Sequence, residues 1–360
     1  MRVVQFTPGV HYGDAVSNEV VIMHKILKEQ GIESYICTTY MDDRLNISYL
    51  LPSDIISLSK EDIAIYHFST SCRIIVDVFC KVNCKKILLY HNVTPDKFFS
   101  DYNIELSKLC INARAELKEL KDIVDYCLAD SDYNKQELIE MGYKCQIDVL
   151  PLLIPFEDYD KVPSAKVLEK YMDDGYTNLL FVGRIAPNKK QEDIIKVFNY
   201  YKKNINSKSR LIFVGNAGGM ELYYEKLQCY VKALELDDVI FTGHVGFEEI
   251  LAYYRLADVF LCMSEHEGFG VPLVEAMWFD IPIIAYNSSA IPWVLGDSGV
   301  LVNNKNSILW SRLIEKILQD TVLQNEILQE QRQRLSEFSF EKTKSLFLRY
   351  LSSFQIGANI

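Results

Sequence analysis

Short apolar runs alternate with stretches of helical periodicity along the chain, and this alternation limits the fold more than any other feature. In the first half, the strand-like runs occupy residues 2–7, 34–39, 62–69, 85–92, 126–130 and 146–150. The alternation then restarts, with further runs at 178–185, 210–216, 239–245, 259–264 and 282–287. Nearly continuous apolar strands separated by helices are typical of parallel sheets covered by helices on both faces. The pattern therefore predicts an α/β protein with two doubly wound, Rossmann-like domains.

A break in the periodicity marks the predicted boundary between the two domains. Prolines and charged residues interrupt segment 150–167, and the sequence after about residue 305 is helical. We therefore predict a first domain over residues 1–155, a second over 156–337 and a closing helical segment over 338–360. A chain of 360 residues, of which 49% are hydrophobic, is long enough to bury two cores.

Composition narrows the choice of partners and compartment. The net charge of −11 argues against a nucleic-acid partner, because phosphate backbones attract clustered Lys and Arg. No run of about 18 apolar residues occurs, and the nine cysteines are scattered without a CxxC pair. We therefore expect a cytoplasmic protein with reduced thiols. A weak peripheral association with the inner face of a membrane is left open.

Two basic residues follow the strand-like run that opens the second half. Arg184 comes directly after "NLLFVG", and Lys189 stands at the start of the helical stretch "KKQEDIIKVF". A guanidinium, an ammonium and the amides of a helix N-terminus together form a good site for a diphosphate. Solvent-facing positions at a strand end and a helix start explain the two residues equally well when they are taken alone.

The stretch "SEHEGFGVPLVEAM" carries the most informative motif. Glu267 precedes a Gly-Phe-Gly turn, and Glu275 lies eight positions further on in a predicted helix. Consecutive amides at the start of a helix can bind hydroxyl or phosphate oxygens. The two carboxylates can accept hydrogen bonds from the hydroxyls of two different rings. The spacing therefore predicts a ligand with a hydroxylated ring at each end and phosphates between them.

Taken together, "GRIAPNKK" and "SEHEGFGVPLVEAM" resemble the retaining glycosyltransferases of family four, whose signature is a Glu-x7-Glu pair spanning a Gly-Phe-Gly turn. The segments "PGVHYGDAVSNEV", "YHNVTPDKFF" and "FTGHV" are similar to other segments of that family, so the resemblance extends over essentially the whole chain. It implies the fold called GT-B, in which two Rossmann-like domains face a central cleft. The second domain would hold most of the donor, and a C-terminal helix would cross back to the first domain.

The resemblance also implies which residues bind the donor, a nucleotide diphosphate sugar linked to GDP or UDP. Arg184 and Lys189 would bind the diphosphate, Glu275 the ribose and Glu267 the transferred sugar. Lys190 stands where many relatives have Gly, so either lysine could reach the phosphate. The other implied donor residues are Gly13 and Asp14 of the first domain, the amides of Gly268, Phe269 and Gly270 around the sugar, and His244 and Val245 near the base.

The implied reaction transfers the sugar, with retention, to a hydroxyl of a glycan or lipid-linked glycan in polysaccharide biosynthesis. The leaving diphosphate would help to deprotonate the acceptor. The implied catalytic residues are His91, Glu267, Arg184 and Lys189, with His91 orienting the reacting sugar and proton transfer as its secondary role. His67 and Ser69 follow another predicted strand and could contact the acceptor, although a structural role explains His67 equally well.

Other residues bear on alternative functions. Asp130 and Asp132 in "ADSD" have a spacing that could hold a divalent ion on a diphosphate. Arg184 and Lys189 already supply that positive charge, so we interpret Asp132 as a helix N-cap and expect no metal and no other cofactor. The glycines of "FVGNAGG" do not form G-x-G-x-x-G, which disfavours a nicotinamide enzyme. A nucleotide-sugar epimerase of the same fold and a non-catalytic nucleotide-sugar-binding protein stay open as alternatives.

Overall fold

The computed structural model describes residues 1–356 and divides into two compact units. Unit 1 consists of Met1–Lys97, Glu105–Ile154 and the segment from Phe338 on. Unit 2 consists of Phe98–Ile104 and Pro155–Glu337. The short segment Phe98–Ile104 therefore belongs with unit 2, although it comes from the first half of the sequence. Residues 357–360 of the predicted closing segment lie outside the described residues.

Unit 1 is built on one parallel sheet of six strands. The strands are β1 (Arg2–Thr7), β2 (Glu33–Thr38), β3 (Ile63–Phe68), β4 (Lys85–Tyr90), β5 (Tyr126–Ala129) and β6 (Gln146–Val149). Their order in the sheet is β2-β1-β3-β4-β5-β6. In the register of the central strands, Val3 of β1 lies opposite Ser34 on one side and Ile63 on the other. The chain thus runs outward from β1 in one direction and from β3 in the other.

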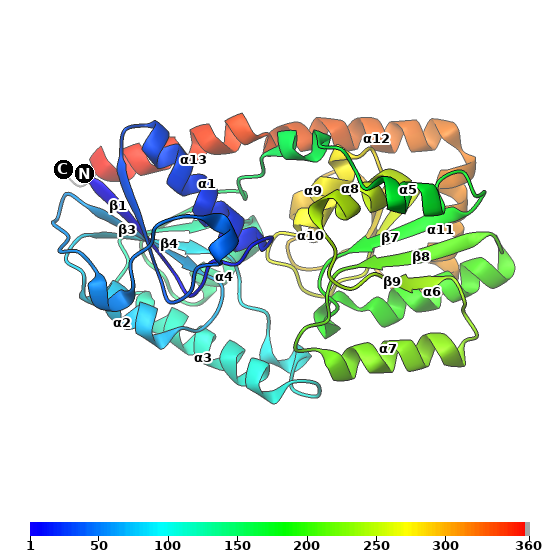
Figure 1. The fold of residues 1–360 in the computed structure, drawn as a ribbon, viewed down its shortest axis with the longest axis horizontal. Coiled ribbons are helices and arrows are strands. Elements are labelled where there is room, and N and C mark those ends of the chain that lie inside the picture. The colour runs from blue at the N-terminus through cyan, green and yellow to red at the C-terminus, as the bar shows by residue number, and fades with distance from the viewer. Residues whose placement is uncertain (357–360) are drawn as a thin grey trace. The chain divides into compact units, whose positions relative to one another are not determined.

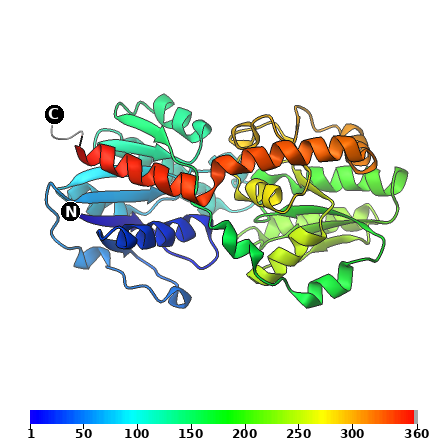
Figure 2. The same ribbon diagram turned by 90° about the horizontal axis from the view of Figure 1, so that it is seen from above.

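Helices cover both faces of this sheet. They are α1 (Ala15–Glu29), α2 (Arg73–Lys81), α3 (Ile104–Leu120), α4 (Asp132–Glu140) and α13 (Phe340–Ile356). Because side chains alternate across a strand, Val3, Ile63 and Leu89 point to one face, where Leu27 of α1 and Phe347 of α13 pack with them. Figures 1 and 2 both show α13 beside α1 on this face, and Figure 1 shows α2 and α3 on the opposite face. Helix α13 therefore completes the core of unit 1.

Unit 2 contains a second parallel sheet of six strands. They are β7 (Thr177–Val182), β8 (Ser209–Val214), β9 (Val239–Phe241), β10 (Val259–Cys262), β11 (Ile283–Tyr286) and β12 (Val300–Val302). Their order is β12-β11-β10-β7-β8-β9. The chain runs from β7 to one edge, returns to β10 beside β7, and then runs to the other edge. This reversal of direction is the strand order of dinucleotide-binding Rossmann domains.

The helices of unit 2 also lie on both faces of their sheet. They are α5 (Ala165–Tyr171), α6 (Gln191–Asn204), α7 (Glu221–Ala233), α8 (Phe247–Leu256), α9 (Val271–Trp278), α10 (Ile291–Leu295), α11 (Ser307–Gln319) and α12 (Thr321–Leu335). Figure 1 shows α6 and α7 on one face and α8 and α9 on the other. Helix α11 packs on α6, where the buried Ser311 hydroxyl donates to the carbonyl of Val197 at 2.9 Å.

The prediction of two doubly wound parallel sheets is confirmed, with three local differences. Strand β12 was not predicted, because three residues at a sheet edge carry too little periodicity to be recognised. The closing helical segment predicted over 338–360 begins its helix at Phe340, after a 3-10 turn at Ser336–Phe338. The predicted N-cap at Asp132 is wrong. The hydroxyl of Ser131 accepts the hydrogen bond from the amide of Asn134 at 3.2 Å, and Asp132 is the first helical residue.

The described residues contain neither a helix that could span a membrane nor a disulfide. Among the helices that the structure describes, none combines the length and the apolar composition that crossing a bilayer requires. All nine cysteines are free thiols, and four of them are buried in the cores, namely Cys37, Cys110, Cys127 and Cys262. The four buried thiols therefore contribute to packing, and none of the nine forms a disulfide.

Candidate functional site

The topology of each sheet marks one place where ligands of open α/β sheets bind. This place is the carboxyl edge of the two neighbouring strands at which the strand order reverses. In unit 2 these strands are β7 and β10, and in unit 1 they are β1 and β3. Arg184 follows β7 and Glu267 follows β10, while Gly13 follows β1 and Ser69 follows β3. Most of the predicted site residues therefore lie at one of these two edges.

Arg184 lies directly after Gly183, the glycine that follows β7. Its guanidinium donates to the carbonyl of Gly218 at 2.8 Å, and its own carbonyl accepts a hydrogen bond from the side chain of Gln191 at 3.1 Å. Gly218 belongs to the glycine-rich loop after β8. Gly215 in that loop has φ of +147°, and an added Cβ would lie 2.1 Å from the carbonyl oxygen of Gly183. Glycine is therefore required where the loops after β7 and β8 meet beside Arg184.

The two neighbouring lysines before α6 make different contacts. Lys189 ends a 3-10 turn, Pro187–Lys189, and its ammonium pairs with the carboxylate of Glu267. Lys190 adopts a left-handed conformation with φ of 56°, and its ammonium lies 3.4 Å from Glu265 and 3.7 Å from Glu192. The left-handed residue turns the two side chains apart. Lys189 is therefore the lysine that joins the loop after β7 to the predicted sugar-binding loop after β10.

The loop before α9 is held in place mainly by its backbone. The amide of Glu267 donates to the hydroxyl of Ser289 at 2.8 Å. The side-chain amide of Asn188 donates to the carbonyl of His266 at 3.0 Å, and Phe269 is buried with 3% exposure. Gly270 has φ of 97° at the N-cap of α9, a conformation that favours glycine. These contacts hold the Gly-Phe-Gly turn rigidly at the start of the helix.

Glu275 lies inside α9 and is held by two tyrosines. One carboxylate oxygen accepts a hydrogen bond from the hydroxyl of Tyr159 at 2.6 Å, and the other accepts one from the hydroxyl of Tyr254. Burial raises the pKa of Glu275, and these two hydrogen bonds act against that rise. Each oxygen keeps one further lone pair. The tyrosines therefore orient the carboxylate while leaving it able to accept hydrogen bonds from a ligand.

The remaining predicted site residues of unit 2 lie in a loop after β9. His244 and Val245 lie in the loop between β9 and α8, and His244 is exposed. His266, next to the sugar loop, is 4% exposed and its ring lies 6.2 Å from that of Phe98, in the segment of the first half that belongs to unit 2. The contact of His244 with a base stays a prediction.

In unit 1, the predicted loop after β1 ends in a helix cap. Gly13 has φ of +81°, and Asp14 is the N-cap of α1, where its carboxylate accepts hydrogen bonds from the amide and hydroxyl of Ser17 at 2.9 and 2.8 Å. Glycine is favoured at this left-handed position. The carboxylate of Asp14 therefore fixes the loop, and the amides around Gly13 are what the loop presents.

A buried polar network lies at the carboxyl ends of β3, β4 and β5. The Nδ1 atom of His91, directly after β4, lies 3.0 and 3.1 Å from the two carboxylate oxygens of Asp130, directly after β5. Its Nε2 atom lies 3.1 Å from Nδ1 of His67, whose Nε2 atom lies 2.8 Å from the side-chain oxygen of Gln5. Glu19 of α1 approaches His91 Nδ1 at 3.5 Å. The structure thus brings together the predicted residues His67 and His91.

Burial and neighbouring charges shift the pKa values in this network. Burial lowers the pKa of His91, but Asp130 and Glu19 raise it by more, to about 9. Burial raises the pKa of Glu19 to about 8, against the pull of His91, and it also raises the pKa of Asp130. Burial and the charge of His91 lower the pKa of His67. His91 is therefore the group in the network that favours a positive charge.

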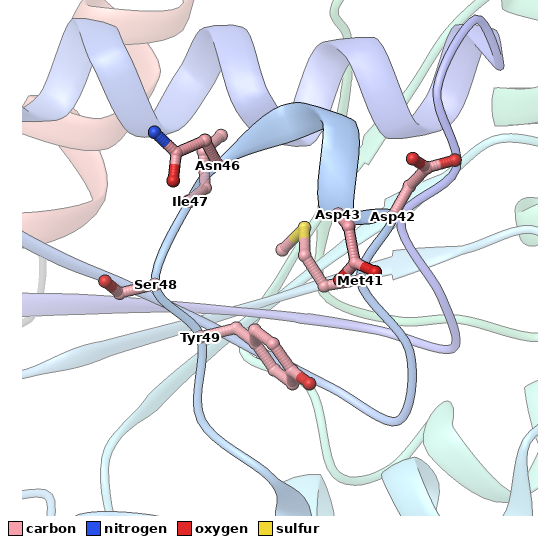
Figure 3. Close-up of a pocket in the computed structure, with 7 residues that line it drawn as sticks. All are labelled: Met41, Asp42, Asp43, Asn46, Ile47, Ser48 and Tyr49. Carbon is pink, nitrogen blue, oxygen red and sulfur yellow. The ribbon is translucent and has the colours of Figure 1, made fainter.

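A separate hollow of about 400 Å³ lies on unit 1, in the segment after β2 (Figure 3). It is lined by Met41, Asp42, Asp43, Asn46, Ile47, Ser48 and Tyr49. None of the predicted site residues lines it. Asp42 is held by Arg44, whose guanidinium donates to both carboxylate oxygens at 2.8 and 2.6 Å, so this acid has a structural partner.

Sequence reasoning missed several residues that hold the predicted ones. Asp130 was considered only as a metal ligand, and Glu19, Gln5, Tyr159 and Tyr254 were not considered at all. Asp130 carried one usable signal, because it directly follows a strand on the same edge as His91. The others are far in sequence from their partners, and no local spacing indicates those contacts.

Comparison with known proteins places these features in a family. Residues 168–341 match the model of the family described as "Glycosyl transferases group 1". The matched residues make up just under half of the chain. They coincide with most of unit 2 and include Arg184, Lys189, Glu267 and Glu275. The family resemblance noted in the sequence is thereby confirmed.

Several curated bacterial proteins are similar to this chain. The O-antigen chain mannosyltransferase B of Escherichia coli is 26% identical over 208 residues, which are 57% of this chain and 54% of that protein. An uncharacterized 41.2 kDa protein in the cps region of Klebsiella pneumoniae is 26% identical over 303 residues, 79% of this chain and 80% of that protein. The chain therefore spans only about half the length of the first of these relatives.

Solved structures share the fold over nearly the whole chain. HepE of Anabaena, in complex with UDP and glucose, has a TM-score of 0.78 at 16% identity, and the match covers 98% of this chain and all of that one. A glycosyltransferase from Rickettsia africae has a TM-score of 0.75 at 17% identity, with 98% of each chain covered. These likenesses confirm the predicted GT-B class of two-domain α/β fold.

Proposed function

We propose that this protein is a retaining hexosyltransferase that moves a sugar from a GDP- or UDP-linked donor to a hydroxyl of a glycan or lipid-linked glycan. The donor would bind to unit 2 without a metal ion. Arg184 and Lys189 would contact the diphosphate, Glu267 and the amides of residues 268–270 the sugar, and Glu275 the ribose. The group 1 domain and the UDP-bound fold relative support a nucleotide sugar as the donor.

The observation that carries this proposal is the pair between Lys189 and Glu267 at the carboxyl edge of β7 and β10. A donor that offers a phosphate to the ammonium and a hydroxyl to the carboxylate can replace each partner with a stronger or equal one. As the sugar–phosphate bond breaks, charge grows on the leaving diphosphate. Lys189 and Arg184 would then bind the transition state more tightly than the ground state, which is what accelerates the reaction.

The acceptor proposal depends on the curated relatives. One acts as an O-antigen mannosyltransferase, and another is named as a GalNAc-diNAcBac-PP-undecaprenol N-acetylgalactosaminyltransferase of Campylobacter jejuni. The first name describes an O-antigen chain, and the second describes a glycan linked to undecaprenol. We therefore propose a role in polysaccharide assembly, as an enzyme that is at most peripheral to the cytoplasmic face of a membrane. The remaining candidate acceptor residues in unit 1, His67 and Ser69, stay predictions.

The test is a transfer assay with and without an acceptor. Purified protein would be incubated with GDP-mannose, UDP-glucose or UDP-N-acetylgalactosamine, alone and with an undecaprenyl-linked oligosaccharide, and products would be separated by mass and linkage. We expect an α-linked product only when both substrates are present. Conversion of the donor without an acceptor would indicate an epimerase. Tight nucleotide binding without any conversion would indicate a non-catalytic binding protein.

A further inference from the structure

The buried network of unit 1 fixes the protonation of its histidines through hydrogen-bond direction alone. The side-chain NH₂ group of Gln5 donates to the carbonyl of Val20 at 3.1 Å. This contact orients the amide, because the reverse orientation would face two oxygen acceptors toward each other. The Gln5 oxygen therefore points at Nε2 of His67, 2.8 Å away, and that nitrogen must carry a proton.

The protonation of His67 in turn determines whether Nε2 of His91 carries a proton. His67 is fully buried among β-strands, where a neutral ring is favoured, so its other nitrogen, Nδ1, has a lone pair and no proton. Nε2 of His91 lies 3.1 Å from that lone pair. Two lone pairs at this distance would repel each other, so Nε2 of His91 must donate a hydrogen bond.

The second nitrogen of His91 faces an acceptor as well. Nδ1 lies within 3.1 Å of both oxygens of Asp130, and an imidazole is a stronger base than a carboxylate, so the shared proton stays on the ring. We propose that His91 is a doubly protonated imidazolium at neutral pH, held by Asp130 on one nitrogen and by His67 on the other. In this state it positions the chain after β4 and takes no part in proton transfer.

The charges that face His91 are consistent with one cation and one anion. Asp130 lies after β5, Glu19 on α1 and Asp14 at the start of α1, and His67 lies on β3. Glu19 is 1% exposed, and among the described residues neither of its oxygens has a well-formed hydrogen bond. The backbone of Leu153 favours its charged form, but burial outweighs this and raises its pKa. A buried carboxylate without such partners is costly. Glu19 is therefore the neutral acid of the set, and Asp130 carries the negative charge that balances His91.

A bound metal ion would satisfy the same lone pairs in a different way. Ligand atoms of Glu19, His67 and His91 all lie within 4.8 Å of one another. The proton arrangement already satisfies both ring nitrogens of each histidine, and the facing nitrogens lie at hydrogen-bond distance. The ring nitrogens of both histidines are therefore satisfied without an ion, and the histidine NMR signals distinguish the two states.

The inference deepens the proposed function by limiting what His91 can do in it. The imidazole side chain is 1% exposed, and both of its N–H groups are used inside unit 1. It therefore has no lone pair with which to accept a proton from an acceptor hydroxyl. In the proposed transfer, that proton would have to go to the leaving diphosphate. His91 would act as a positioning residue for Asn92, which has φ of +78° and whose amide donates to Asn134 at 2.8 Å.

The charge of each histidine can be measured directly by NMR. The chain has six histidines, so deuterated protein labelled with ¹³C at histidine Cε1 should give six signals in a titration from about pH 5.5 to 9.5. Replacing His11, His24, His244 and His266 by Gln, one at a time, assigns four signals and leaves the network untouched. We expect the two remaining signals to stay constant between about pH 6 and 8, one with a charged and one with a neutral chemical shift.

Several results would overturn the inference. Two neutral signals would place the proton on Asp130, and an ordinary titration near pH 6.5 would show a free histidine. A shift of both signals on treatment with a chelator, reversed by Zn²⁺, would show a metal ion instead. None of these outcomes depends on enzymatic activity, so failure here and failure of the transferase proposal are distinguishable.

The positioning role has its own kinetic test. In the wild type, kcat/KM should show no histidine inflection between about pH 6 and 8. The change Asp130→Asn removes the anion, so the His91 signal should titrate at least about one pH unit lower and kcat/KM should become pH-dependent in this range. Asp130→Glu keeps the charge and should restore the flat profile at least in part. A flat profile in Asp130→Asn, with its histidine signal shifted, would show that the charge of His91 does not matter for turnover.

Discussion

In both unit 1 and unit 2, polar side chains lie at the carboxyl edge of a parallel sheet. The charged side chains are buried in unit 1 and partly exposed in unit 2. In unit 1, the side chains of His91 and Asp130 are 1% and 3% exposed and satisfy each other. In unit 2, the side chains of Lys189 and Glu267 are 20% and 12% exposed and are paired across two loops. A network closed by hydrogen bonds stabilises its unit, whereas an accessible ion pair can exchange its partners for a ligand. In the proposed function, the more accessible edge is therefore the one that would bind the ligand.

The largest effect should come from breaking the accessible pair. Lys189→Met removes the charge that would bind the diphosphate and leaves Glu267 unpaired, so we expect kcat/KM to fall about a hundredfold, which is roughly 2.7 kcal/mol. Urea unfolding should change by less than about 1 kcal/mol, because the pair is partly solvated. Lys190→Met is the matched control and should change kcat/KM less than about threefold. Equal losses in both variants would contradict the separation of the two lysines.

A smaller loss should follow when the ribose contact is removed. Glu275→Ala deletes a charge-assisted hydrogen bond worth about 1.5–3 kcal/mol, so the Kd for the nucleoside diphosphate should rise roughly tenfold to a hundredfold. Calorimetry would measure it. Tyr159→Phe, which removes one of the two hydroxyls on this carboxylate, should weaken binding by less. Unchanged nucleotide affinity in Glu275→Ala would show that this carboxylate serves only α9 and its tyrosines.

The stability of unit 1 should instead depend on pH. In the folded network, the pKa rises from about 6.5 to 9 for His91 and from about 4.5 to 8 for Glu19. The folded chain therefore keeps protons that the unfolded chain releases. This stability is therefore fully present at low pH and is lost as pH rises through these folded values. Between pH 7 and 9 the combined loss should be on the order of 3 kcal/mol, of which His91 contributes about 2. Hydrogen exchange at the amides of β4 and β5 would measure it.

Two variants sharpen the pH comparison. Glu19→Gln removes one of the two titrating groups, so the loss of stability between pH 7 and 9 should become smaller. His24→Gln is the control, because His24 is a buried histidine outside the network that pairs with Ser34 at 2.9 Å. Burial lowers the pKa of His24 to about 4, so its contribution changes below neutral pH only. A loss that is identical in Glu19→Gln and the wild type would remove Glu19 from the explanation.

A further, more moderate loss should come from changing the guanidinium in unit 2. Arg184→Lys keeps the charge but loses the planar fork, so kcat/KM should fall about tenfold, equivalent to roughly 1.4 kcal/mol. The lysine would also lose the bond that Arg184 makes to the carbonyl of Gly218. Steady-state kinetics with varied donor would measure the effect. Wild-type kinetics in this variant would assign the phosphate contact elsewhere.

The smallest effect should be that of metal removal. The groups proposed around the diphosphate are Arg184, Lys189 and helix-start amides, and a divalent cation there would meet positive charge instead of oxygen ligands. Chelator-treated protein should therefore transfer sugar at nearly its untreated rate. Asp132→Asn should also leave turnover largely intact, because Asp132 only begins α4. Loss of activity that Mn²⁺ or Mg²⁺ restores would revive a metal site.

The elements that could be predicted from the sequence are those whose signal is local. The apolar runs fix strands such as β1 and β7, and the "EGFG" turn fixes the start of α9, because each depends on neighbouring residues. Strand β12 was missed because its three residues are too few for a period. The position of Asp132 was misjudged because Ser131 and Asp132 are both good N-caps, and only the backbone geometry decides between them.

The contacts that orient the predicted site residues could not be predicted in the same way. Tyr159 and Glu275 are separated by 116 positions, and His91 and Asp130 by 39. Such pairs form only after separate strands and helices have assembled, so no spacing in the sequence indicates them. The residues that carry chemistry stand in motifs, whereas the residues that hold them in place are scattered. The second group therefore needs the fold to be known.

Helix α13 has a consequence for how the chain is made on the ribosome. Phe347 and Leu351 belong to the core of unit 1, although β6, the last strand of that unit, ends at Val149. At translation rates of about 5–20 residues per second, unit 1 would wait roughly 10–40 s for these side chains while unit 2 is synthesised. Until then, the apolar face next to α1 is open to the surroundings. Nascent unit 1 should therefore bind chaperones that recognise exposed apolar surface, and unit 2 should finish folding first.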